Sequence, residues 1–221
     1  MNFLSHFYFD RNCNDAYHVL GAVMPDLLRN ADKTAQIKPE RLPPQNDAAI
    51  CALISGWKKH LEIDRHFHSS KFFKYHAHQL KLLLAPAIAG SEVKPFFLGH
   101  IALELILDNL LLTTDTVFAD DFYDHLKNAE EVKIAAFLKL NCVDPQKFLQ
   151  FYNRFINEKY LYSYTQLDSV VHALKGVCSR IWKNPFTKTQ EVDVNKVITN
   201  YRQALSADYK SVFAEIDTLL V

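Results

Sequence analysis

The sequence is poor in residues that interrupt helices, since its 221 positions include only five glycines and eight prolines. It has no Gly-rich phosphate loop and no G-x-S-x-G motif, which argues against a P-loop nucleotide site and a serine-hydrolase nucleophile. Its four cysteines are scattered without a C-x-x-C pair. We therefore expect reduced thiols in a cytoplasmic protein rather than a disulfide framework or a cysteine-bound zinc.

The chain also has no excess of positive or negative charge, because 25 Lys and Arg balance 25 Asp and Glu. This balance argues against a general nucleic-acid binder. The apolar first nine residues lack the basic segment of a signal peptide, and no run of eighteen apolar residues is free of charge. We expect no stable membrane insertion, and the sequence leaves the oligomeric state open.

Apolar residues are abundant and follow helical spacing through most of the chain. They make up 49% of it, with sixteen Phe and ten Tyr, so the chain can bury a substantial core. The pattern predicts an all-α, single-domain helical bundle over residues 1–221. Its site-bearing part is 1–113, and additional helices occupy 115–221.

Helix signals place the individual elements. The first nine residues read as a short extended segment or a first helical turn, and a helix capped by Asn14 or Asp15 is kinked near Pro25. Residues 30–46, with three prolines, read as a long surface loop. Further helices are expected at 48–84, 92–113, 115–127, 129–139, 144–157, 162–183 and 193–219.

The stretch 97–112 is apolar on almost every side, which is typical of a helix at the centre of a domain. Its exceptions include His100, Glu104 and Asp108, which follow one another at i, i+4 and i+8 and so share one face. Burying an imidazole and two carboxylates costs several kcal/mol unless they are paired or bind a metal. We expect another polar element to meet this face.

A second expected helix carries candidate ligands at the same i, i+4 and i+8 spacing: His60, Asp64 and His68. His6 and Asp26 near the amino terminus can join them. Imidazole and carboxylate donors together suit Mn, Fe or Zn. One alternative is that the polar residues of the 97–112 helix only hydrogen-bond each other.

A metal-activated water is the nucleophile that this set of residues can supply, because no side-chain nucleophile is indicated. Carboxylates beside it would orient the water or take its proton, and the candidates are Asp64, Asp108 and Glu104.

Four segments together resemble the acyl carrier protein phosphodiesterases. They are Met1-Asn-Phe-Leu-Ser-His-Phe7, Gly21-Ala-Val-Met-Pro-Asp-Leu27, His60-Leu-Glu-Ile-Asp64 and Leu103-Glu-Leu-Ile-Leu-Asp-Asn-Leu-Leu111, in the family's order. The resemblance covers roughly the first half of the chain and implies a fold like a distorted HD-domain phosphohydrolase. It also implies hydrolysis of the phosphodiester between 4′-phosphopantetheine and a serine of acyl carrier protein, within fatty acid biosynthesis, with a divalent metal that is most often manganese.

The positions that match the family's motifs are His6, Asp26, His60, Asp64 and Asp108. The chain also departs from the pattern. His68 stands where the family has Asp, Ser70 stands where it has His, and Asn109 replaces the His of an Asp-His pair. His100 and Glu104 are additional, so the resemblance implies a rearranged metal set.

An acidic carrier protein implies a basic docking surface. The expected residues are Lys58, Lys59 and Arg65 on the long helix and Arg29 at the start of the loop. The alternative is an ordinary solvated face whose charges are balanced by nearby acids.

Two other functions remain open at this point. Gly21-Ala-Val-Met-Pro-Asp26 and Gly99-His100-x3-Glu104 also resemble parts of zinc-dependent phospholipase C-type proteins, which hydrolyse lipid phosphodiesters. A non-catalytic helical interaction module, with structural polar pairs or a decayed site, is the other alternative.

Overall fold

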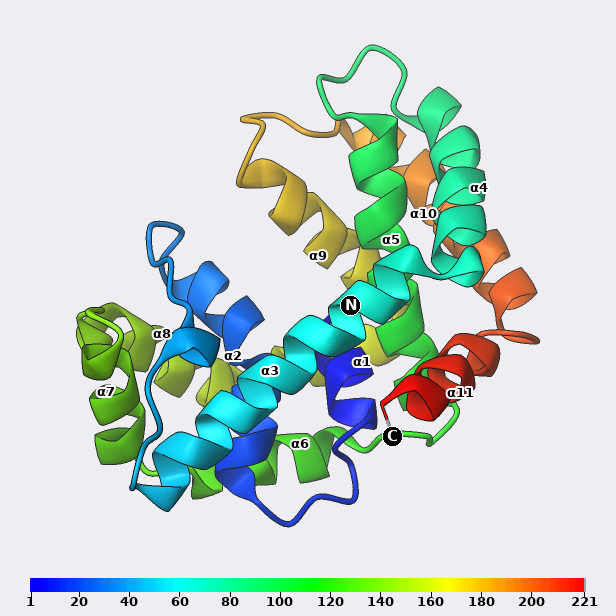
Figure 1. Ribbon diagram of the computed structural model, residues 1–221. Helices are drawn as coiled ribbons and strands as arrows, with labels where there is room; N and C mark the ends of the chain where they lie inside the picture. Colours follow the sequence, from blue (N-terminus) through cyan, green and yellow to red (C-terminus); the bar gives the residue numbers. More distant parts are fainter. Residues whose placement is uncertain (221) are drawn as a thin grey trace. The chain divides into compact units, whose positions relative to one another are not determined.

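The computed structural model describes residues 1–220, which form eleven α-helices, two 3-10 helices and no β-strand (Figure 1). The all-α prediction is confirmed. The helices are α1 Phe3–Tyr8, α2 Ala16–Ala31, η1 Pro39–Arg41, α3 Ala48–Ser69, α4 Lys71–Ala87, α5 Pro95–Thr113, α6 Ala119–Asn128, α7 Glu131–Leu140, α8 Pro145–Glu158, η2 Tyr160–Thr165, α9 Leu167–Ser179, α10 Lys188–Leu205 and α11 Lys210–Leu219.

The chain divides into two compact units, each built from segments that are distant in sequence. Unit 1 contains Met1 and residues 65–116 and 162–220, and unit 2 contains residues 2–64 and 117–161. Helix α3 contributes residues to both units. The expectation that residues 1–221 form one domain stays a prediction.

Unit 1 is organised around α5, which packs against α4, α9 and α10 (Figure 1). Among residues 1–220, α5 is the only helix long and apolar enough to span a membrane, but 67% of its most apolar window is buried inside the structure. Burial of this kind is what a core helix shows. The expectation that 97–112 lies at a domain centre agrees with this position.

Unit 2 places α2 against α1, α6 and α8. Helix α2 begins where the sequence predicts, because the Asp15 carboxylate caps it by accepting from the backbone N–H groups of Tyr17 and His18. It continues through Pro25 to Ala31. The first residues form a short helix, α1, so the extended alternative for them is wrong.

Two long helices expected from the sequence are each divided in the structure. The segment 48–84 breaks at Ser70, where the backbone is extended (φ −62°, ψ 153°). The Ser70 hydroxyl caps α4 by accepting a hydrogen bond from Phe73 N–H at 3.0 Å. The segment 193–219 becomes α10 and α11. Helix α10 starts earlier than expected because Thr187 and Gln190 form a capping box.

Helices α2 and α3 approach each other closely where two glycines stand between their backbones. A Cβ atom at Gly21 would lie 2.3 Å from the carbonyl oxygen of Leu53. A Cβ atom at Gly56 would lie 2.0 Å from the carbonyl oxygen of His18. Real Cβ contacts are never this short, so only glycine fits either position at this helix separation.

We therefore expect Gly56→Ala to lower the stability of the protein by about 2 kcal/mol or more and its melting temperature by about 5 °C or more, because two backbones must separate. The matched control is Gly176→Ala in the last turn of α9, where a Cβ meets no atom within 4 Å. That variant should be more stable by about 1 kcal/mol, because alanine favours a helix. Thermal unfolding followed by circular dichroism measures both, and equal effects of the two substitutions would contradict the close approach.

Candidate metal sites

Two sets of the predicted ligands lie close enough together to hold a metal ion. We call them the His6 group, formed by His6, Asp26 and His60, and the His68 group, formed by His68, His100 and Glu104. Within each group, one potential ligand atom from every residue lies within 4.8 Å of the others. The His6 group belongs to unit 2 and the His68 group to unit 1.

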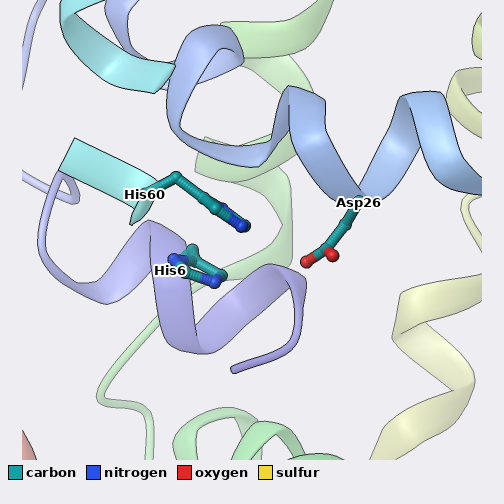
Figure 2. Close-up of side chains that lie close together, drawn as sticks. All are labelled: His6, Asp26 and His60. Carbon is teal, nitrogen blue, oxygen red and sulfur yellow. The ribbon is translucent and has the colours of Figure 1, made fainter. Parts of the chain in front are cut away.

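The His6 group draws one side chain from each of α1, α2 and α3, and Figure 2 shows the three pointing toward one another. The imidazole rings of His6 and His60 stack with centroids 3.8 Å apart and an interplanar angle of 18°. Both residues are buried, with exposures of 0% and 4%. Two buried rings this close repel each other if both are protonated.

A backbone hydrogen bond sets the tautomer of His60. Its Nδ1 lies 2.9 Å from the carbonyl oxygen of Ala22, and a carbonyl only accepts, so Nδ1 carries the hydrogen. In the neutral ring Nε2 then presents its lone pair. Metal-binding histidines commonly donate their other ring N–H to a backbone carbonyl in this way. The close approach of α2 and α3 brings the carbonyl and the ring together.

His6 is a buried imidazole without a hydrogen bond at either ring nitrogen. Its Nε2 lies 3.3 Å from Oδ1 of Asp64. Burial, and next the neighbouring His60, lower the pKa of His6 to about 4, so the ring is neutral near pH 7. Leaving such a group unsatisfied costs about 1–3 kcal/mol. A metal ligand is the role that fits a neutral, unsatisfied imidazole here.

Asp64 adds a second carboxylate beside this group. Its Oδ2 lies 3.7 Å from Nε2 of His60, one helical turn earlier on α3, and its side chain is 33% exposed. Burial alone would raise the pKa of Asp64, but the adjacent His6 holds that pKa well below its ordinary value. With two imidazoles and two carboxylates, the donors fit a divalent cation such as Mn, Fe or Zn.

The His68 group lies at the junction of α3 and α5. Nε2 of His100 lies 2.9 Å from Oε1 of Glu104, so the hydrogen bond considered as an alternative for this helix is present. Oε1 also lies 3.4 Å from Nε2 of His68 and 3.1 Å from the amino group of Met1. Although burial alone would raise it, the pKa of Glu104 lies well below its ordinary value because of these positive and hydrogen-bonding neighbours.

The structure places Asp108 in neither group. It is fully buried on α5, one turn after Glu104, and its role as a ligand or catalytic residue stays a prediction. The neighbouring Asn109 has a structural role, since its amide donates to the Tyr164 carbonyl at 2.6 Å and accepts from Nε of Arg202 at 3.0 Å.

Three of the four expected docking residues are exposed, whereas the fourth is paired with a buried carboxylate. Lys58, Arg29 and Arg65 are exposed. Nζ of Lys59 instead lies 2.6 Å from Oδ1 of the buried Asp10, so its charge is paired within the protein, and its role in docking stays a prediction. Sequence reasoning missed this pair because no helical spacing links positions 10 and 59.

Comparison with known protein families gives one match. The family model described as "Acyl carrier protein phosphodiesterase" matches residues 1–216. The likeness therefore extends well beyond the first half of the chain, to which the sequence analysis limited it. Neither a curated protein nor a solved structure matches the chain.

A bound divalent cation should stabilise the folded protein if the His6 group binds it. For chelator-treated protein, Mn²⁺ at about 100 times its dissociation constant should add about 2.7 kcal/mol and raise the melting temperature by about 5–10 °C. His6→Ala should show a smaller rise, because it loses the contribution of the ion at the His6 group. His172→Ala, at an exposed position on α9, is the control and should keep it. A full Mn²⁺-dependent rise in His6→Ala would exclude His6 as a ligand.

Proposed function

Because this chain belongs to the acyl carrier protein phosphodiesterase family, we propose that it hydrolyses the 4′-phosphopantetheine phosphodiester of holo acyl carrier protein with a divalent metal at the His6 group. The observation that carries the proposal is the geometry of the His6 group: a fully buried imidazole whose Nδ1 has no hydrogen-bond partner lies beside His60, Asp26 and Asp64. Manganese is the proposed metal, with iron or zinc as the other candidates. We keep the expectation of a cytoplasmic location.

Each side chain of the group supports this chemistry in a different way. A bound divalent cation would lower the pKa of water and polarise a phosphoryl oxygen. His60 is held by the Ala22 carbonyl with Nε2 directed toward the other donors. The buried His6 stays neutral at physiological pH because its pKa is low, so it does not compete with a cation for the carboxylates.

Asp64 is suited to orienting water rather than to removing its proton. Its side chain is one-third exposed, whereas both imidazoles are buried, so its carboxylate is within reach of solvent. A carboxylate with a depressed pKa is a weak general base, but it still accepts a hydrogen bond from water. In the overall reaction the water oxygen bonds to phosphorus, the bond from phosphorus to the serine oxygen breaks, and the serine recovers its hydroxyl hydrogen.

The two alternatives receive less support. The segments that resemble phospholipase C-type proteins fall in different units, with Gly21–Asp26 in unit 2 and Gly99–Glu104 in unit 1, and the family match is to the carrier-protein enzymes. A purely structural pairing of His6 with Asp64 still leaves Nδ1 of this buried ring without a hydrogen-bond partner.

The decisive assay incubates the Mn²⁺-loaded protein with holo acyl carrier protein and follows loss of the phosphopantetheine mass. We expect release of 4′-phosphopantetheine, and a loss of about 100-fold or more in His60→Ala and Asp64→Ala, because outer residues of metal sites alone account for about 10–100-fold. His172→Ala should remain fully active.

The same protein is assayed against phosphatidylcholine vesicles in parallel. Release of phosphocholine without action on the carrier protein would replace the proposal by the phospholipase C alternative. Inactivity on both substrates, with no binding of metal, would support the non-catalytic module.

Charge reversal tests the proposed docking residues one at a time. Lys58→Glu, Arg29→Glu and Arg65→Glu should each raise KM for the carrier protein several-fold at low salt with little change in kcat, because exposed charges guide association. Lys139→Glu, at an exposed position on α7, makes the same change of charge and should leave KM unaltered. An equal rise of KM in all four variants would indicate a general charge effect instead of docking.

A further inference from the structure

We propose that His68, His100 and Glu104 form a second site for a divalent transition metal, in addition to the one proposed at the His6 group. The three residues come from the end of α3 and the first half of α5, and they belong to unit 1. The family resemblance does not account for them, because His100 and Glu104 are additional to its pattern and His68 replaces an Asp.

The spacing of the three donor atoms matches that of ligands on a single ion. Nε2 of His68 and Nε2 of His100 lie 3.1 Å apart, and Oε1 of Glu104 lies 3.4 Å and 2.9 Å from them, respectively. Ligand atoms about 2.1 Å from one ion stand about 3.4 Å apart in a tetrahedral arrangement and about 3.0 Å apart in an octahedral one. All three distances fall at or close to these two values.

The two imidazole rings are held in place by a shared aromatic neighbour. Phe73, in the first turn of α4, packs edge-on against His68 with centroids 4.8 Å apart and against His100 at 4.9 Å. Interplanar angles of 79° and 80° show that both rings meet the phenyl group in the same manner. The aromatic contacts restrict the rotation that would separate the two Nε2 atoms.

The position of His100 depends on a glycine beside it. A Cβ atom at Gly99 would lie 2.7 Å from the backbone nitrogen of Lys81 and 2.8 Å from the carbonyl oxygen of Ala77. The start of α5 therefore lies directly against the backbone of α4, and a larger residue at position 99 would push the two helices apart.

The composition and exposure of the group indicate which ion it would take. Two imidazoles and one carboxylate favour Zn, Fe, Co or Mn over Ca and Mg, which prefer oxygen ligands alone. The side chains of His68 and His100 are 33% and 37% exposed, so an ion can enter from solvent and retain water on its open side. Three protein ligands with open positions are typical of an exchangeable rather than a closed structural site.

The competing interpretation is a hydrogen-bonded ion-pair network. The amino group of Met1 and the imidazole of His100 both lie within 3.1 Å of Oε1 of Glu104, and they can satisfy this carboxylate without an ion. A network of this kind predicts no cation binding at these residues. A metal site predicts that removing either imidazole removes one bound ion.

The test titrates the full-length, chelator-treated protein with Co²⁺, and follows its d–d absorption together with the stoichiometry from calorimetry. We expect two ions per wild-type chain, and one ion in His100→Ala and in Glu104→Gln, with affinity for the lost ion reduced at least about 10-fold. His6→Ala should lose the other ion and keep this one. His78→Ala, an exposed histidine on α4, is the control and should bind two ions.

Two ions bound by His100→Ala with wild-type affinity would overturn the proposal, as would a wild-type protein that binds a single ion lost only in His6→Ala. Circular dichroism of each variant without metal verifies that it is folded. If His100→Ala is unfolded, Glu104→Gln decides the question, because it keeps the shape of the side chain. Loss of carrier-protein hydrolysis does not enter this test, so failure of the proposed function leaves a separate signature.

Discussion

The close contact between α2 and α3 is the constraint on which the His6 group depends. Gly21 and Gly56 allow the two backbones to approach until no Cβ atom fits between them. That approach brings the Ala22 carbonyl within 2.9 Å of the His60 ring and so selects the tautomer that leaves Nε2 available. A methyl group at either glycine would move the helices apart and would disturb the site as well as the packing.

Two buried polar side chains, Asn109 in unit 1 and Asp10 in unit 2, are paired with partners from distant parts of the chain. The amide of Asn109 joins η2 to α10, and Lys59 of α3 neutralises the buried Asp10. His6 differs from them, because its ring is fully buried and neither nitrogen has a hydrogen bond. That contrast is the physical reason for assigning it to a metal rather than to the general polar network.

The i, i+4 spacing identified most of the candidate ligands, but it did not show which of them lie together in the folded protein. His60, Asp64 and His68 share one face of α3, and His100 and Glu104 share one face of α5. From the sequence we expected another polar element to meet the face that carries His100 and Glu104. In the structure His60 and Asp64 meet His6 from α1, while His68 meets His100 and Glu104 from α5. Helical periodicity determines which side chains share a face, but not which face lies opposite.

Helical periodicity and composition are local properties of the chain, and they indicated the all-α class and the buried character of α5. Four short motifs indicated the family, and residue types named the candidate ligands of both groups. The tertiary structure decided the rest. It divided the long helix at Ser70, engaged Lys59 with Asp10, and supplied a backbone carbonyl that no residue type could indicate. The last two features depend on contacts between segments about 40–50 residues apart, which the spacing of residues within one helix does not indicate.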